Sequence, residues 1–371
     1  LIPSATSVAH GCFKVNTFIE TPHKYFIINS YKSYYIALNY GIIYMRGWCY
    51  IMELKKMKFI DLFAGIGGFR YALESFGCKC VFSSEWDKYC QESYNLNFGE
   101  IPYGDITKID EKDIPSFDIL CAGFPCQPFS ISGKQKGFED TRGTLFFDIV
   151  RIVSYHKPKI IFLENVKNLK AHNSGATFEV ISNTLDSLNY NIYYKVLNAK
   201  DFNLPQNRER ITIVCIRKDI DNGEFKFPEP SKKFVTISDI KEDDSITEKY
   251  ILKRKDIHID EKKLNEAIKN GRVQKPLQIG VIGQGGQGNR IYHENGIGIT
   301  LAASSGGAAS KTGAYYINGK VRKLSPREAA RLQGFPEEFK IIENDSQSLK
   351  QFGNSVPINL LKEVFKGLKD I

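Results

Sequence analysis

Hydrophobic and polar positions fall into a regular pattern from about residue 58 onward. Residues 59–63 form an apolar run of strand length, residues 64–68 form a glycine-rich turn, and residues 69–76 make a helical stretch. Residues 80–84 and 118–123 repeat the strand-length pattern. Strands that are joined by helices predict an α/β fold, with a Rossmann-like sheet and helices on both of its faces.

Acidic side chains follow the predicted strands at the edge where an open α/β sheet binds its ligands. Glu85 and Asp87 flank Trp86 after the second strand, and Asp105 lies at the next turn. An acid at the end of the second strand binds ribose hydroxyls in dinucleotide enzymes and in S-adenosylmethionine enzymes alike. Trp86 offers a flat surface for an adenine. Because the glycine turn lacks the GxGxxG spacing, the pattern predicts an adenosine-type pocket without naming the cofactor.

Cys126 stands between two prolines, directly after the strand at 118–123. Proline fixes φ and interrupts strands and helices, so this loop is stiff and presents the sulfur at the carboxyl end of the sheet. A nucleophilic thiol needs partial exposure and a stabilised thiolate, whereas Cys121, inside the strand, fits a packing role. The cysteines form no CxxC pair and have no histidine at ligand spacing. We therefore expect no metal site and reduced thiols in a cytosol.

Five segments of the chain resemble, in order, the motifs of the DNA (cytosine-5)-methyltransferase family. They are DLFAGIGG (residues 61–68), GFPCQPFS (123–130), ENV (164–166), QNRER (206–210) and QFGNSVP (351–357). The resemblance runs from about Met57 to the C-terminus. It implies methyl transfer from S-adenosylmethionine to C5 of a cytosine in duplex DNA, by a Rossmann-like methyltransferase sheet with a smaller, β-rich target-recognition domain.

The resemblance also implies catalytic roles. Cys126 matches the thiol that adds to C6 of the ring, which breaks its aromaticity and makes C5 nucleophilic. Glu164 follows an apolar strand at 159–163 and matches the acid that protonates or hydrogen-bonds N3 and the exocyclic amine. Arg210 matches an arginine that binds the pyrimidine O2, and Arg208 is the second arginine of that motif. No residue stands out as the base that removes the C5 proton, so water or hydroxide is our expectation.

The residues expected to hold S-adenosylmethionine come from the motifs, the strand ends and the first turn of a helix. They are Phe63, Gly65, Ile66, Gly67, Gly68, Glu85, Trp86, Asp105, Ile106, Pro125, Leu145, Asn354 and Ser355.

DNA contacts are expected from two parts of the chain. A cytosine inside a duplex cannot present C6 to a thiol and must be flipped out, and the polar segment with Ser130, Ser132 and Lys134 is predicted to close over the DNA. The glycine-rich residues 280–313 can approach a groove closely, and an arginine there can bind a guanine edge. By resemblance, the target contacts from this second part are Gln287, Arg290 and Thr300.

The recognition sequence is inferred from residues 283–292, which resemble the same stretch of a bacterial family member that methylates the inner cytosine of GCGC. Residues 302–307 depart from that protein, where it has an aromatic residue and a further glycine. The domain boundaries that we expect are a catalytic domain at 52–228, a recognition domain at 229–340 and a returning segment at 341–371.

The first 51 residues differ from the rest in composition, with Glu20 as their single acidic residue. They show neither a helical period nor a clean alternation. We interpret this leader as translated upstream sequence, with the start at Met52 or Met57, and expect it to pack poorly. Residues 325–334 predict a helix with Ser325 as its N-cap, Pro326 at its first position and Gly334 at its end.

Composition supports this function only weakly. A net charge of +9 and a pI near 8.9 favour a polyanionic partner, and the chain has no apolar run of the roughly 18 residues that a membrane span needs. The resemblance implies a bacterial cytoplasmic enzyme, acting as a monomer in a restriction-modification system with a cognate endonuclease. Two alternatives remain open at this point, a transfer-RNA cytosine-5 methyltransferase and a NAD-dependent Rossmann oxidoreductase.

Overall fold

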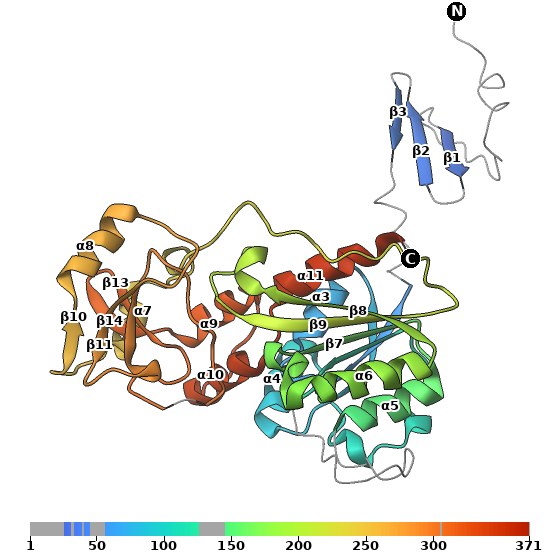
Figure 1. Ribbon diagram of the computed structural model, residues 1–371, viewed down its shortest axis with the longest axis horizontal. Coiled ribbons are helices and arrows are strands. Elements are labelled where there is room, and N and C mark those ends of the chain that lie inside the picture. The colour runs from blue at the N-terminus through green and yellow to red at the C-terminus, as the bar shows by residue number, and fades with distance from the viewer. Residues whose placement is uncertain are drawn as a thin grey trace, which may run out of the picture.

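The computed structural model describes residues 26–30, 33–38, 41–44, 56–125, 145–304 and 306–370. Its central element is a six-stranded sheet in the order β5-β4-β6-β7-β9-β8 (Figure 1). The pairs β4–β5, β4–β6 and β6–β7 are parallel, and β9 is antiparallel to both of its neighbours. The strands are β4 (Lys58–Leu62), β5 (Lys79–Ser84), β6 (Ile119–Gly123), β7 (Ile160–Val166), β8 (Tyr190–Asn198) and β9 (Glu209–Arg217).

Helices cover both faces of this sheet (Figure 1). Because side chains alternate along a strand, Phe59 and Phe162 point into one buried cluster and Ile60 and Ile161 into the other. The helices α3 and α11 contribute to the first cluster, and α5 and α6 to the second. The predicted α/β fold is confirmed. The helices are α3 (Gly68–Glu74), α4 (Lys88–Phe98), α5 (Leu145–His156), α6 (Ala176–Ser187) and α11 (Ile358–Lys366).

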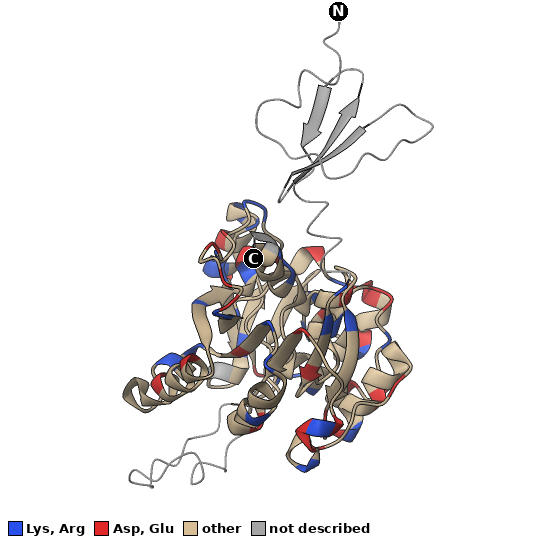
Figure 2. Ribbon diagram, turned by 90° about the vertical axis from the view of Figure 1, so that its right-hand side faces the viewer, with Lys and Arg blue, Asp and Glu red and all other residues tan. Residues whose placement is uncertain are grey.

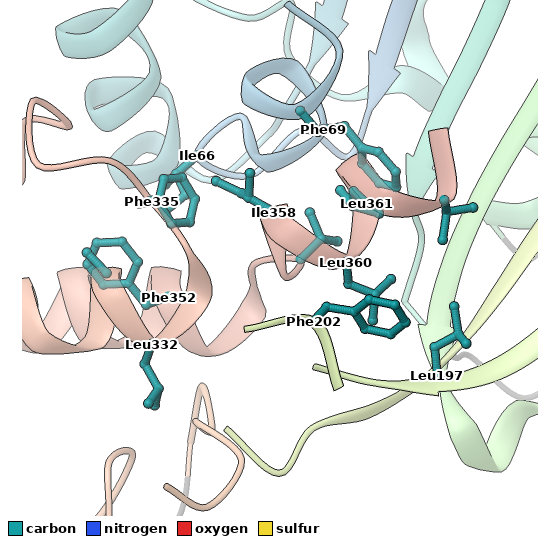
Figure 3. Packing of buried hydrophobic residues seen from close by; sticks show 14 of the residues in the cluster. Ile66, Phe69, Leu197, Phe202, Leu332, Phe335, Phe352, Ile358, Leu360 and Leu361 are labelled. Atoms are coloured by element: carbon teal, nitrogen blue, oxygen red, sulfur yellow. The ribbon is translucent and has the colours of Figure 1, made fainter. Parts of the chain in front are cut away.

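The C-terminal part of the chain packs back onto the large sheet. Figure 3 shows Ile358 and Leu361 of α11 near Phe69 of α3, and Phe352 of α10 beside Phe335. These side chains are at most 3% exposed, and full burial of one such side chain stabilises the fold by about 1.5–3 kcal/mol. Two further helices, α9 (Pro326–Gln333) and α10 (Asp345–Asn354), lead into α11.

The predicted caps of α9 are confirmed. The Ser325 side chain accepts a hydrogen bond from Glu328 N at 3.1 Å, and the Glu328 carboxylate accepts one from Ser325 N at 2.9 Å. Pro326 occupies the first turn, and Gly334 ends the helix with a φ of 82°. This reciprocal pairing is a capping box, which satisfies backbone N–H groups that the helix itself leaves unbonded.

A second sheet forms a small lobe, which we define as residues 244–323; the large lobe comprises the six-stranded sheet, its helices and residues 324–370. The small lobe has the strand order β10-β11-β12-β13-β14, in which only the β12–β13 pair is parallel. Its elements are α7 (Asp244–Thr247), β10 (Ile257–Ile259), α8 (Glu261–Asn270), β11 (Gln278–Ile282), β12 (Arg290–His293), β13 (Ala314–Ile317) and β14 (Lys320–Lys323). A small β-rich unit was expected here. The exact domain boundaries stay predictions.

Three short strands near the N-terminus pair antiparallel with one another in a separate sheet. They are β1 (Phe26–Ser30), β2 (Ser33–Leu38) and β3 (Gly41–Tyr44). The sequence pattern did not predict them. The other residues of the leader lie outside the described ones, and our expectation that the leader packs poorly stays a prediction. Within the described residues, none of the helices has the length and apolar character that a membrane crossing requires.

Charged residues of both signs are interspersed over the ribbon in Figure 2. Many are paired; Arg151 of α5, for example, lies 2.9 Å from Glu111 and 3.0 Å from Asp148 of the same helix. The net positive charge therefore says little about where an anionic partner binds, and the site has to be identified from its geometry.

Candidate active site

A cavity of about 940 Å³ lies where β4, β5, β6 and β7 end. The residues at these strand ends line it, and the helices α5 and α10 each contribute a terminal residue, Leu145 and Asn354. Open α/β sheets bind their ligands at this carboxyl edge. The cavity is thus the place where the expected cofactor and catalytic residues should meet.

The turn after β4 is held in place by Glu85 at the end of β5. Its Oε2 accepts a hydrogen bond from Gly65 N at 2.8 Å, and its Oε1 accepts one from Asp87 N, also at 2.8 Å. Burial raises the pKa of Glu85, while these backbone donors act in the opposite direction. Within the turn, Phe63 has a φ of 56°, a conformation that non-glycine residues rarely adopt. This strained turn contributes Phe63 and Gly65 to the cavity wall.

Residues next to Glu85 in the cavity wall offer groups of the kind expected for an adenosine. Trp86 is 76% exposed and lines the cavity together with Asp105 and Ile106. Ser84 Oγ is buried there and has no hydrogen-bond partner among the described residues. Buried polar atoms normally have a hydrogen-bond partner. A carboxylate at the strand end, a flat indole and an unsatisfied hydroxyl are the groups that suit a ribose and an adenine.

Glu164 and Arg210, which both line the cavity, form an ion pair. Glu164 lies on β7 opposite Gly123 of β6, and Arg210 Nε is 3.2 Å from Glu164 Oε1. That oxygen is buried and accepts no hydrogen bond from the described residues. Burial raises the pKa of Glu164, and the nearby charges of Arg210 and Arg208 oppose the rise. A carboxyl that is held towards its protonated form is suited to donate a proton to a substrate.

Arg208 is a fixed element of the scaffold next to this pair. Its guanidinium is buried and donates to Leu301 O at 3.3 Å, to Gly353 O at 3.1 Å and to Ser355 O at 2.7 Å. Burial lowers the pKa of Arg208 to about 9. Its Nη atoms are bonded to backbone carbonyls of both lobes, while the residue also lines the cavity. The catalytic role expected of Arg208 stays a prediction.

Two neighbouring contacts tie the lobes together at the same point. The fully buried Gln206 donates to Leu332 O at 3.1 Å and accepts from Leu301 N at 3.1 Å. At Gly353, an added Cβ would lie 2.5 Å from Ala302 C, so the two backbones are in direct contact. Gln206 belongs to the QNRER motif, and the resemblance implied no role for it.

Pro125, at the end of the β6 loop, is exposed and lines the cavity. Asn165, for which no role was expected, donates to Phe124 O at 2.8 Å and so fixes the start of this loop. The position of Asn165 beside Glu164 in the ENV motif is the sequence feature that could have indicated a role for it. Cys126 itself, together with Ser130, Ser132 and Lys134, lies outside the described residues.

The expected cofactor residues divide into two groups. Those at the cavity wall are Phe63, Gly65, Glu85, Trp86, Asp105, Ile106, Pro125, Leu145 and Asn354. The others, which do not line the cavity, are Ile66, Gly67, Gly68 and Ser355. An added Cβ at Gly68 would lie 2.6 Å from Val356 Cγ2, so this glycine serves close packing behind the turn. Every one of these assignments to a cofactor stays a prediction.

Lys350 is a cavity residue that the sequence analysis missed. It comes from α10 and its Nζ lies 2.8 Å from Asp87 Oδ2, which draws α10 towards the start of α4. The Asp87 carboxylate also caps α4, accepting from Tyr89 N at 2.9 Å. Its spacing of four residues before Asn354 places Lys350 on the same helix face, which could have pointed to it.

The expected DNA contacts of the small lobe lie apart from the cavity. Arg290 is exposed at the start of β12. Thr300 Oγ1 donates to Asn207 O at 2.6 Å, a contact with the large lobe. The backbone of Gln287 begins the short helix η8 (Gln287–Asn289). Their contacts with DNA stay predictions.

The described cysteines outside the cavity wall have the packing character expected of them. Cys121 and Cys215 are fully buried in strands, and burial raises the pKa of both thiols. Burial likewise raises the pKa of Cys80 to about 11. Such thiols stay protonated and unreactive at neutral pH. The described residues contain no group of His, Cys, Asp or Glu that could hold a metal ion.

Comparison with known proteins identifies the family. The model of the family described as C-5 cytosine-specific DNA methylase matches residues 57–370. The chain is 53% identical to the type II methyltransferase M.HhaI of Haemophilus parahaemolyticus over 312 residues, which are 84% of this chain and 94% of that protein. It is 45% identical to M.HpaII of Haemophilus parainfluenzae, over 84% of this chain and 89% of that one.

Solved structures agree at the level of the fold. The S. pombe Dnmt2 methyltransferase superposes with a TM-score of 0.61 at 19% identity, covering 84% of this chain and 98% of that chain. An Entamoeba histolytica methyltransferase, EhMeth, gives the same TM-score of 0.61 at 19% identity, covering 85% of this chain and 98% of that chain. From the family match and the identity to curated relatives, this chain belongs to the C-5 cytosine-specific DNA methylase family.

Proposed function

We propose that this DNA (cytosine-5)-methyltransferase modifies the inner cytosine of GCGC in duplex DNA, through a covalent bond between Cys126 and C6 of a flipped base. The enzyme class follows from the family. The observation that carries the proposed chemistry is the buried Glu164, whose pKa is raised and whose Oε1 is unbonded in the cavity that Pro125 also lines. Cys126 is the next residue in the sequence after Pro125.

In the first step, the Cys126 thiolate forms a bond to C6 of the cytosine. The electron pair of the 5,6 double bond moves towards N3, and the protonated Glu164 carboxyl gives its proton to that nitrogen. Because Arg210 lies 3.2 Å from Glu164, its cation then stabilises the carboxylate that is left behind. The ring now has enamine character at C5, which is the carbon to be methylated.

S-adenosylmethionine, the methyl donor of the family, supplies an electrophilic methyl group when bound. The residues that fit its adenosine part are Glu85, Trp86 and the turn at Gly65. After the transfer, water or hydroxide removes the C5 proton and the bond between sulfur and C6 breaks. The ring becomes aromatic again, Glu164 recovers its proton from N3, and Cys126 leaves as a thiolate.

The position of the acid supports base flipping. Glu164 is only 8% exposed at the cavity wall, so a cytosine stacked within a duplex cannot reach it, and the base has to enter the cavity. The small lobe offers Arg290 for a guanine edge, next to a glycine-rich backbone. We propose that this lobe selects the sequence while the large lobe performs the chemistry.

A transfer assay on defined nucleic acids tests substrate and sequence. Protein is incubated with radiolabelled S-adenosylmethionine and either a GCGC duplex, the same duplex with one base pair of the site changed, or transfer RNA. We expect label only in the GCGC duplex, which should then resist a nuclease that cuts GCGC. Equal label in both duplexes would overturn the target sequence, and label confined to RNA would overturn duplex DNA as the substrate.

The covalent step is tested with a duplex that carries 5-fluorocytosine at the target position. Fluorine cannot leave as a cation, so the wild-type protein should become trapped on the DNA, and the Cys126→Ser variant should not. Cys80→Ser is the matched control, because Cys80 lies outside the cavity wall and should not affect trapping. Trapping by Cys126→Ser would refute the covalent role of this thiol.

We further propose that the protein acts as a monomer and is paired with a restriction endonuclease of the same specificity, as expected of a type II system. The support is the identity to type II methyltransferases. Analytical ultracentrifugation at assay concentration should give a single species of about 42.1 kDa. A dimer that stays intact at that concentration would contradict the monomer.

A further inference from the structure

Two glycine-rich loops of the small lobe touch each other backbone to backbone. We define the first loop as residues 283–289 and the second loop as residues 306–309. Ala309 N donates to Gly288 O at 3.2 Å. An added Cβ at Gly288 would overlap Gly306 O, and one at Gly307 would lie 2.7 Å from Gly288 O. Neither position has room for a side chain, and their glycines are explained by this close contact.

The side chain of Asn289 bridges the two loops. Its Oδ1 accepts a hydrogen bond from Ala308 N in the second loop at 2.8 Å. Its Nδ2 donates to Gly285 O in the first loop at 3.1 Å. Both polar atoms are thus engaged inside the protein, and the residue is partly buried. Asn289 therefore holds the loops to each other, and it is the residue immediately before the exposed Arg290.

The second loop is in turn anchored on the large lobe. Just after it, Lys311 Nζ donates to Ser346 O and to Ser346 Oγ, both at 2.7 Å, at the start of α10. Just before it, Ala302 packs against Gly353 at the end of α10. The position of Arg290 is therefore connected, through Asn289 and the second loop, to the helix whose end lines the cavity.

We propose that Asn289 is a positioning residue that sets the DNA sequence preference by keeping the two loops in register. This inference rests on the proposed function of the small lobe in DNA recognition. Bidentate contact with a base edge requires the arginine to be placed within a fraction of an ångström. If Asn289 is removed, the loops can separate, Arg290 loses its fixed position, and incorrect sites are discriminated less well.

The test is a methylation assay on a pool of duplexes with randomised sequence, followed by sequencing that identifies methylated cytosines. The full-length wild type, Asn289→Ala, Asn289→Asp and Asn295→Ala are compared. Asn295 is the matched control, because its Nδ2 donates to Ala267 O at 3.1 Å in the same lobe but away from both loops. The pool reports the preference of the wild type whatever its target sequence is.

We expect Asn289→Ala to lower the preference for the best site over single-base variants roughly tenfold, as the loss of two hydrogen bonds predicts. Asn289→Asp keeps the acceptor for Ala308 N but loses the donor to Gly285 O. Its preference for the best site should therefore lie between those of the wild type and Asn289→Ala. Asn295→Ala should keep the wild-type preference. The dissociation constant of S-adenosylmethionine should be equal in all four proteins.

The two possible failures are distinguishable. If the wild type methylates no duplex, the proposed function fails. If the wild type has a preference and both Asn289 variants keep it unchanged, the positioning role of Asn289 is refuted. Thermal unfolding is followed in parallel, and if Asn289→Ala does not fold, Asn289→Asp alone decides the outcome. A preference that is lost equally in Asn295→Ala also counts against the proposal, because it would show a general effect of a weakened lobe.

Discussion

Burial raises the pKa of two carboxyl groups of the large lobe, Glu164 and Asp61. Glu164 could be predicted from the sequence, because its motif and its place after an apolar strand mark it. Asp61 could not, since its motif gives no sign that the carboxyl is fully buried on β4 and that neither oxygen has a hydrogen-bond partner among the described residues. Burial raises the pKa of Asp61 well above its ordinary value.

The first prediction concerns the stability of the Asp61→Asn variant. A group whose pKa is higher in the folded state stabilises the protein below its unfolded pKa, and this contribution is lost as the pH rises through the folded pKa. The wild type should therefore lose about 1.4 kcal/mol of unfolding free energy per pH unit over that window. Asn cannot ionise, so the variant should lack this decline. Urea unfolding of both proteins at pH 5 and pH 8 measures it; parallel pH dependences would contradict the role of Asp61.

The second prediction concerns the pH dependence of methyl transfer. Because Glu164 must be protonated to donate to N3, the rate should fall as the pH rises through its raised pKa. Glu164→Gln has no proton to give, so its rate should be lower by about 10²–10⁴-fold and lack this falling limb. Single-turnover rates between pH 6 and pH 9 provide the measurement. Unchanged S-adenosylmethionine binding serves as the control, and a wild-type profile in the variant would exclude the acid role.

At the scale of elements, α9 and β14 are joined by a buried ion pair. Arg322 Nη2 lies 2.6 Å from Glu328 Oε1, and Nη1 lies 2.7 Å from Oε2. The two side chains are 2% and 0% exposed. The sequence predicted the helix, its cap and its end, since these depend on neighbouring residues. It did not predict that the capping Glu328 also binds Arg322 of the preceding strand. A glutamate in a capping box and an arginine in a short strand are both common at solvent-exposed positions, so neither indicates a buried ion pair.

The third prediction tests this pair. Glu328→Leu leaves the buried Arg322 guanidinium without its counter-ion, and should lower the unfolding free energy by about 3–5 kcal/mol. The double variant Arg322→Met with Glu328→Leu removes both charges and should recover most of the loss. About 1 kcal/mol should stay lost, because the capping box is gone. Urea denaturation of the three proteins gives these values. A double variant no more stable than the single one would show that the unpaired charge is not the cause.

At the scale of the whole molecule, the junction between the lobes was the part that the sequence could not supply. The α/β order and the position of the cavity follow from local patterns and motifs. The junction depends on contacts such as that of Arg208 with Leu301, which are 93 residues apart. These contacts run from side chains to backbone carbonyls, which every residue type has. Nothing in the identity of Leu301 or Gly353 therefore marks them as partners of Arg208.

The fourth prediction is that Arg208→Lys weakens the binding of S-adenosylmethionine and the binding of duplex DNA together. A lysine presents a point charge and cannot donate to Leu301, Gly353 and Ser355 with the geometry of a guanidinium. We expect roughly tenfold weaker binding of S-adenosylmethionine and of duplex DNA, as the loss of one or two charged hydrogen bonds implies. Calorimetry and fluorescence anisotropy measure the two affinities. Asn295→Ala is the control for a general loss of stability, and a change in only one affinity would contradict a shared role.

The close contact of Gly353 with the small lobe leaves no room for a side chain at this position. An added methyl group there would lie 2.6 Å from Ala303 N and 2.5 Å from Ala302 C, so it would overlap the peptide unit that joins these two residues of the small lobe. Gly353→Ala would push the small lobe, which we propose selects the sequence, away from the large lobe, which we propose performs the chemistry. Such a protein should be temperature-sensitive, methylating at a permissive temperature and becoming silent on modest warming while each half keeps its own fold.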